Sequence, residues 1–351
     1  MLSKDQTQDV GAGALAIQTN GDVNIVKNGL SYAEAKEVAL DVFKANFYDL
    51  SKAAEQVARA RAEQITEDFL EKLQRENPQG FERANDPDFQ YALFTVQKEH
   101  ARGGDSDLGA LLVDLLVDRS KQEKRNLLQI VLTECLSTAP KLTEGQLAIL
   151  AVVFLLRYTT NNRNTSHEEL GLYFDRLISP FIALLPEPDS SLMHLEFAGC
   201  GSSTLSNASA EEIFSQSYRG LFFDGFDESE FSEVVMSREA KDRFFVRCIN
   251  DPTKYQVGML SRQAMDEHLE IHNVTGEAKA KVIELFDRGV MNSAQIKAKC
   301  IEIRPYMESL FKAWDTLELS SFTLTSVGIA IGHANIKKYY GEFTNLSIWI
   351  K

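Results

Sequence analysis

The chain has 351 residues and a mass of 39.4 kDa, and its 37 Lys+Arg against 51 Asp+Glu give a formal net charge of −14. With 44% hydrophobic and 25% charged residues it has the composition of a folded globular protein, which excludes a disulfide-rich miniprotein, a collagen-like chain and a low-complexity disordered chain. The acidity also argues against a protein whose main task is to coat nucleic acid.

The sequence carries no targeting or membrane signal that we can identify. Met1–Val10 is polar and does not lead into an apolar segment, so no secretory signal is predicted. The longest apolar run, Leu147–Leu156, has about half the length that a membrane-spanning helix needs. We therefore expect a cytoplasmic protein without a membrane partner. Its four scattered cysteines are expected to be reduced, buried thiols: Cys135, Cys200, Cys248 and Cys300.

Residues 1–29 differ from the rest of the chain and predict a β arm. Two short runs, Ala14–Gln18 and Val23–Val26, flank Asn20-Gly21, a strong signal for a hairpin turn. An isolated hairpin is only marginally stable in water, so it would add to another sheet edge or pair with copies of itself. An arm without fixed structure is the alternative. The candidate residues for self-association are Ile17, Val23 and Ile25.

Residues 30–200 predict a helical bundle. Three segments, Leu108–Val117, Leu127–Leu136 and Leu147–Tyr158, have the continuous apolar faces that are typical of a bundle core. Gly199–Ser209 is small and polar, and we predict that it is an interdomain linker.

Residues 201–351 predict a second helical region that ends in a winged-helix-like module at about 315–351. Leu317–Thr325 alternates apolar and polar residues, which is typical of a strand. The pattern of Ser326–Tyr340 predicts a helix, and that of Leu346–Ile350 predicts a terminal strand. The predicted fold class is therefore mostly α: a multi-helix bundle with a short N-terminal β-hairpin arm and a C-terminal winged-helix-like module.

The terminal region differs from the rest in charge. Residues 261–351 hold 11 Lys+Arg and 11 Asp+Glu, so the net charge of −14 lies upstream. Lys337 and Lys338 at the end of the predicted helix are the candidates for nucleic-acid contact, although they also complement the helix dipole. Many winged helices pack only against protein, and we favour protein partners over nucleic acid.

Three further patterns suggest chemistry, and each lacks a required part. His268 and His272 lie one helical turn apart, but the Glu that zinc proteases place directly after the first His is missing. Gly199–Thr204 lacks the Gly-Lys-Ser/Thr ending of a phosphate loop. Cys200 and His194 have no identifiable orienting group. We predict no catalytic residue, no cofactor and no metal.

Three stretches resemble an uncharacterised family of bacterial proteins, and this resemblance runs from end to end. They are Gly21-Asp22-Val23-Asn24-Ile25, the central Leu111–Leu116, and Leu324–Ala330 with Leu346–Ile350. More loosely, the Leu-rich helices and the Leu324-Thr325…Gly328 spacing are similar to the alpha-type abortive-infection proteins. The first resemblance supplies no catalytic residues, and the second implies a setting in phage defence.

These observations lead to three hypotheses. The first is a non-enzymatic cytoplasmic protein that forms a homo-oligomer, has a phage or host protein as its partner, and acts in antiviral defence or stress response. The second is a DNA-binding regulator that uses the C-terminal module. The third is an effector enzyme with an unrecognised site, near Cys200 or near His268 and His272.

Overall fold

The computed structural model describes residues 30–46, 52–122, 124–188, 190–205, 207–232, 234–341 and 343–351. This part of the chain is mostly helical, as predicted, and its strands form two small antiparallel sheets. The predicted β arm, with Ile17, Val23 and Ile25, lies outside the described residues. Within the described ranges, no helix is both long and apolar enough to cross a membrane.

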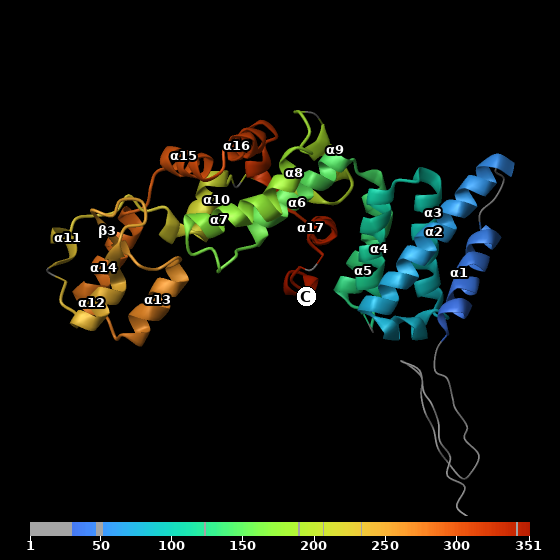
Figure 1. Cartoon of the computed structure of the whole chain (residues 1–351), viewed down its shortest axis with the longest axis horizontal. Coiled ribbons are helices and arrows are strands. Elements are labelled where there is room, and N and C mark those ends of the chain that lie inside the picture. The colour runs from blue at the N-terminus through green and yellow to red at the C-terminus, as the bar shows by residue number, and fades with distance from the viewer. Residues whose placement is uncertain are drawn as a thin grey trace, which may run out of the picture.

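The first five helices form a bundle at one end of the molecule (Figure 1). Asp86 and Asp105 begin two of them, because each side chain accepts hydrogen bonds from backbone N–H groups of the first turn. A 3-10 turn, Pro78–Arg83, connects the second and third helices. The five helices are α1 (Tyr32–Asn46), α2 (Lys52–Glu76), α3 (Pro87–Gly103), α4 (Ser106–Ser120) and α5 (Leu127–Thr138).

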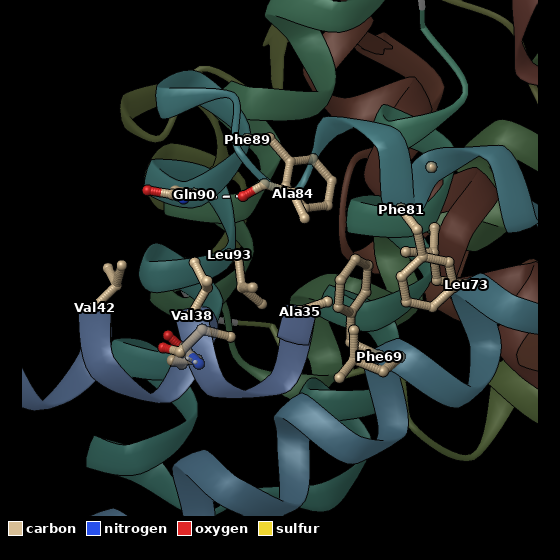
Figure 2. Close-up of a pocket in the computed structure, with 14 residues that line it drawn as sticks. Ala35, Val38, Val42, Phe69, Leu73, Phe81, Ala84, Phe89, Gln90 and Leu93 are labelled. Carbon is tan, nitrogen blue, oxygen red and sulfur yellow. Dashed lines mark hydrogen bonds between the residues drawn. The ribbon is translucent and has the colours of Figure 1, made fainter. Parts of the chain in front are cut away.

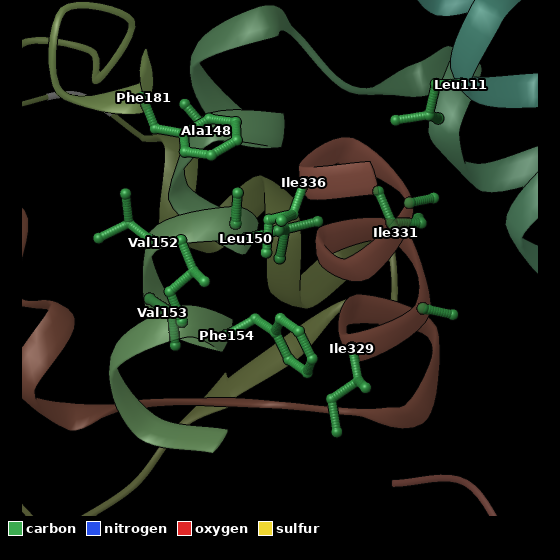
Figure 3. Close-up of a cluster of buried hydrophobic side chains, with 14 of the residues drawn as sticks. Leu111, Ala148, Leu150, Val152, Val153, Phe154, Phe181, Ile329, Ile331 and Ile336 are labelled. Atoms are coloured by element: carbon green, nitrogen blue, oxygen red, sulfur yellow. The ribbon is translucent and has the colours of Figure 1, made fainter. Parts of the chain in front are cut away.

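Two helices far apart in sequence, α6 (Glu144–Tyr158) and α17 (Ser326–Tyr340), pack together at the centre. All residues from Ala148 to Leu156 are buried, and so are all from Gly328 to Lys337. Helices that are apolar on every side belong in the interior of a fold. Their side chains interdigitate with one another and with Phe181, as Figure 3 shows.

Shorter helices complete the same hydrophobic cluster around α6. The chain passes through a π-helical turn, Phe174–Ile178, between α7 and α8. Further single turns of 3-10 helix lie at Ala139–Lys141, Arg219–Leu221 and Leu319–Ser321. The helices are α7 (His167–Tyr173), α8 (Ser179–Ile182), α9 (Ser191–Phe197), α10 (Ala210–Ser217), α15 (Ser293–Ile303) and α16 (Met307–Thr316).

The predicted linker Gly199–Ser209 is mostly exposed, and only Cys200 and Gly201 are buried among its described residues. It contains β1 (Gly201–Ser203), which pairs antiparallel with β4 (Phe322–Leu324). Gly201 permits this approach, since a Cβ there would lie 2.3 Å from the ring of Phe322. Local composition gives no information on a partner strand more than 100 residues away.

The C-terminal prediction holds in part. A strand (β4) leads directly into α17, as expected, but the predicted terminal strand is a 3-10 turn, Leu346–Ile348. The turn forms because the Asn345 side chain accepts a hydrogen bond from the backbone of Ser347. The winged-helix-like identity of the module stays a prediction.

A second hydrophobic cluster forms a lobe at the other end of the molecule, within residues 223–290 (Figure 1). The chain enters and leaves it side by side: Met291 N donates to Phe222 O at 2.8 Å, and Asp224 N to Gly289 O at 2.9 Å. The first cluster takes residues from both sides of the predicted domain boundary at 200. The lobe consists of α11 (Ser229–Ser232), α12 (Arg238–Phe244), β2 (Phe245–Arg247), β3 (Tyr255–Val257), α13 (Arg262–Ile271) and α14 (Gly276–Arg288).

Candidate functional site

A polar cleft of about 890 Å³ lies where the ends of α2, α4 and α17 meet the start of α5, Gly341 and the terminal segment 343–347. Its lining combines apolar side chains, among them Leu128, Leu132 and Leu346, with charged side chains of α2, α17 and the end of α4. Its volume lies in the range of small-molecule sites, which span about 300 to 1,000 Å³.

Six alternating charges form an ion cluster beside this cleft. Lys337 of α17 lies at its centre, with its Nζ 3.2 Å from Asp118, 3.4 Å from Glu76 and 3.4 Å from Asp114. Lys121 pairs with Asp118 at 2.8 Å and with Glu76 at 3.4 Å. Lys72 completes the set by pairing with Glu76 and Asp114. Three ammonium groups and three carboxylates therefore neutralise one another.

Helical spacing brings these groups together. Lys72 and Glu76 are four residues apart on α2, as are Asp114 and Asp118 on α4, so each pair projects from one face. The cluster then depends on three helices from distant parts of the chain. Because Asp114 and Lys337 are buried, the loss of one partner would leave an uncompensated charge in the interior.

The pKa directions agree with this pairing. Burial by itself would raise the pKa of Asp118 and of Glu76, but the positive charge of Lys337 and its neighbours outweighs burial and holds both pKa values below their usual range. Burial by itself would lower the pKa of Lys337, whereas Asp118, Asp114 and Glu76 raise it. Asp118, Glu76 and Lys337 are therefore charged at neutral pH.

His333 lies one turn before Lys337 on α17, lines the cleft, and is only 3% exposed. Its Nε2 donates to the carbonyl oxygen of Thr344 at 2.6 Å, so Nε2 carries the proton of the neutral ring. Burial lowers the pKa of His333, which favours that neutral form. Its Nδ1 is then a hydrogen-bond acceptor, and this buried atom has no partner among the described residues.

Aromatic rings hold the imidazole in place. The ring centroids of Phe343, Trp349 and Phe154 lie 5.4, 5.9 and 6.1 Å from that of His333. Trp349 Nε1 donates to Tyr158 O at 2.8 Å, which fastens the terminal segment to the end of α6. The imidazole is therefore held rigidly, and its Nδ1 is buried rather than open to the cleft.

The predicted nucleic-acid residues do not lie on an open surface. Lys337 is 9% exposed and belongs to the ion cluster. Lys338 pairs with Asp107 at 3.5 Å and lies over the ring of Tyr339. Both charges are therefore engaged within the chain, and their contact with nucleic acid stays a prediction.

The other residues singled out from the sequence do not form a site. Burial raises the pKa of the Cys200 thiol to about 12, and His194 interacts with Gln146 rather than with this thiol. His268 Nδ1 lies 3.0 Å from Ala264 O in its own helix. Throughout the described ranges, no group of three or more His, Cys, Asp or Glu side chains could hold a metal ion.

An apolar gap between α1, α2 and α3 is a packing defect rather than a ligand site. Figure 2 shows its lining, including Phe69, Phe89 and Leu93. The gap has a volume of about 10 Å³. A single water molecule needs about 10 to 15 Å³, so no ligand fits here without movement of the helices.

Sequence reasoning missed the cleft although part of its signal was present. Asp114 interrupts the Leu-rich run 111–117, and Asp118 follows it at helical spacing. A charged residue in an apolar helix has to find a partner, so this pattern predicts an opposite charge on another helix. Nothing in the sequence singles out His333.

Comparisons with known proteins show the family. A family model whose description names no activity matches residues 29–350, so the chain belongs to that uncharacterised family. No curated protein and no solved structure matches the chain.

Proposed function

We propose that this protein acts by binding rather than by catalysis, and that the polar cleft is its binding site. The observation that carries the proposal is the cleft itself, which has a volume of about 890 Å³ and is lined by polar and apolar side chains beside six mutually paired charges. Such a site can hold a ligand through shape and hydrogen bonds. The described lining contains no cysteine, and its charged groups are engaged in ion pairs.

We place this binding protein in bacterial antiviral defence or stress response, where it self-associates. The support for defence is the resemblance of the Leu-rich helices and of Leu324-Thr325…Gly328 to alpha-type abortive-infection proteins. The support for self-association is the predicted hairpin around Asn20-Gly21. Its partner would be a second copy of the chain together with a phage or host protein.

Two measurements test this proposal. Cells that express the full chain should reduce phage plating relative to cells with an empty vector, and His333→Gln should weaken the protection. The matched control His272→Phe changes a histidine in the lobe and should protect as the unaltered chain does. Equal plating with and without the protein, over a broad phage panel, would contradict the role in defence.

Self-association has its own test. Light scattering coupled to size-exclusion chromatography should give a multiple of 39.4 kDa for the full chain and a smaller mass for a variant without residues 1–29. If both are monomers, the self-association proposal fails while the binding proposal stands.

An effector enzyme is the second candidate, and one observation favours it. A neutral imidazole whose Nε2–H is oriented by a carbonyl has the arrangement of a general base. It needs a movement of the terminal segment that exposes His333 Nδ1, which is buried in this structure, to the proton of a substrate. This candidate would be favoured over the first if the protein turns over a substrate and His333→Gln abolishes that turnover while the variant still binds the substrate.

The DNA-binding alternative predicts salt-sensitive duplex binding that weakens when Lys337 and Lys338 become Glu. Lys337→Glu would place a fourth carboxylate in the ion cluster and disturb the fold, so Lys338→Glu is the informative variant. This alternative would be supported if the protein binds duplex DNA at low salt and Lys338→Glu weakens that binding. The absence of duplex binding at low salt would contradict it.

A further inference from the structure

We infer that two copies of the chain pair through an apolar, almost uncharged surface on α9 and the loop after β1, which we call the α9 face. Three side chains that are open to solvent define this face: Met193, Phe197 and Leu205. The inference rests on the proposed self-association and names its surface. It does not involve the polar cleft.

The apolar side chains of the α9 face are unusually open. Phe197 is 90% exposed, Met193 67% and Leu205 105%. Met193 and Phe197 lie four residues apart and project from the same side of α9, whereas Ser191 and Leu195 on its other side are buried. Such large apolar residues are usually found in the interior, so a group of them in water marks a contact with another surface.

Hydrogen bonds hold the helix and the loop in place. Ser203 N donates to the carboxylate of Glu196, the residue before Phe197. The next amide of the loop, Thr204 N, donates to Ser321 O at 2.9 Å. The backbone that carries the α9 face is therefore ordered before a partner arrives, so pairing would cost little conformational entropy.

The lack of charge indicates that the partner is a second copy of the chain. Residues 190–210 contain a single Asp, Glu, Lys or Arg, namely Glu196, although a quarter of the whole chain is charged. The segment 316–330, which includes the strand paired with β1, likewise contains only Glu318. Two copies that each carry a net charge of −14 repel one another, so they approach most easily where neither presents charge. A two-fold contact places the same residues on both sides, which apolar and hydroxyl groups tolerate and like charges do not.

The size of the α9 face suits such a contact. One Phe, one Met and one Leu that are this exposed present about 500 Å² of apolar surface, against the about 800 Å² that each partner buries in a stable interface. The exposed residues Ser202, Ser203 and Thr204 can supply the remainder as a polar rim. A membrane fits less well, because residues 190–210 hold no Lys or Arg to meet anionic head groups.

Sedimentation equilibrium of the full chain, over a range of concentrations, tests the inference. Phe197→Ser combined with Leu205→Ser should raise the dissociation constant of pairing about a hundredfold, because each copy loses two central apolar contacts. The matched control, Val235→Ser combined with Ile271→Ser, changes two exposed apolar residues of the lobe and should leave this constant unchanged. All four side chains are exposed, so thermal unfolding of both variants should match that of the unaltered chain.

Salt provides a second readout. In 0.5 M sodium chloride the unaltered chain should pair more tightly, because salt screens the repulsion between two acidic copies and the α9 face has no ion pair to lose. A contact held by ion pairs would weaken under the same conditions.

The outcomes separate this inference from the proposed function. If the double variant on the α9 face associates as tightly as the unaltered chain, or if salt separates the copies, the inference is wrong. Should removal of residues 1–29 alone abolish association while the double variant has no effect, the proposed self-association stands without the α9 face. If the double variant separates the copies and removal of residues 1–29 does not, the inference stands and the predicted hairpin is not the contact. A full chain that is monomeric at every concentration contradicts both.

Discussion

The two hydrophobic clusters of this protein are built in different ways. The larger one surrounds α6 and α17, which are buried on all sides over most of their length. The smaller one, in the lobe, is an aromatic cluster in which Phe231 stacks on Phe245 at 4.3 Å and meets Tyr255 edge-on at 4.9 Å. Its helices α13 and α14 bury only single stripes of residues.

This difference decides where charge can be buried. A helix enclosed on all sides has no solvent face, so Lys337 of α17 can stay charged only by meeting carboxylates of α2 and α4. The helices of the lobe keep their charged residues in water. The cleft with its ion cluster therefore belongs to the larger cluster. The lobe has its own hydrophobic cluster and is joined to the larger one at two adjacent crossings of the chain and by hydrogen bonds with Arg219–Leu221. Four predictions test this comparison, and the first concerns the largest effect.

Phe286→Ala in the lobe and Trp314→Ala in the larger cluster should each lower the free energy of unfolding of their own region by about 3 to 5 kcal/mol, because both side chains are fully buried. Hydrogen exchange should separate the two variants. Phe286→Ala should deprotect the amides of α13 and α14 only, whereas Trp314→Ala should deprotect those of α6 and α17. Deprotection of α17 by Phe286→Ala would mean that the clusters unfold as one.

Lys337→Met should lower the free energy of unfolding by about 3 kcal/mol, because three carboxylates then share two lysines in a partly buried site. Urea denaturation measures the loss. Lys338→Met changes the next residue of the same helix, and it should cost about 1 kcal/mol or less because its one ion pair ends on an exposed Asp107. Equal losses for the two variants would contradict a special role of the ion cluster.

The ion cluster should also shape the dependence of stability on pH, by about 1 kcal/mol. The folded pKa values of Glu76 and Asp118 lie below the unfolded ones, so their contribution is present above about pH 4 and is lost as the pH falls through the folded values. The pKa of Lys337 is raised, so its contribution is present below about pH 10 and is lost as the pH rises further. In Lys337→Met the free energy of unfolding, followed by circular dichroism, should therefore change less with pH in both the acidic and the alkaline range. An unchanged dependence on pH would contradict this assignment.

The smallest effect is expected at the junction of the two clusters. Asp287 pairs with Arg262 at 2.9 Å and with Arg219 at 3.3 Å, but its side chain is 48% exposed. Asp287→Asn should therefore change the free energy of unfolding by less than about 1 kcal/mol, and 0.5 M salt should remove most of the difference. A larger, salt-resistant loss would show that charge rather than packing fastens the lobe.

Local signals in the sequence predicted much of the helical fold. The helix expected at Ser326–Tyr340 has those bounds in the structure, and the predicted core segment Leu147–Tyr158 lies within α6 and ends at the same residue. These features depend on residues within a few positions of one another. The pairing of β1 with β4 does not, which is why the strand at Gly201–Ser203 was not predicted.

The candidate site was less predictable for the same reason. Glu76, Asp114 and Lys337 meet only after three helices have packed, and their spacing along the chain contains no information on that meeting. Lys337 was recognised as a notable residue, but its buried position changes what it can contact. The acceptor of His333 depends on a hydrogen bond to the terminal segment, which a sequence pattern does not reveal.

The close approach of α6 and α17 also constrains the order in which the protein can fold during synthesis. A Cβ on Gly332 would lie 2.7 Å from the carbonyl oxygen of Leu150, so the two backbones meet with nothing between them. The ribosome makes α6 first and must then add the whole chain from residue 159 to residue 325 before α17 exists. Throughout that interval the apolar surface of α6 lacks its main partner and is open to aggregation or to chaperones. Folding of the larger cluster therefore cannot be completed before α17 has been made, while the lobe, whose contacts are local, can form on the nascent chain earlier.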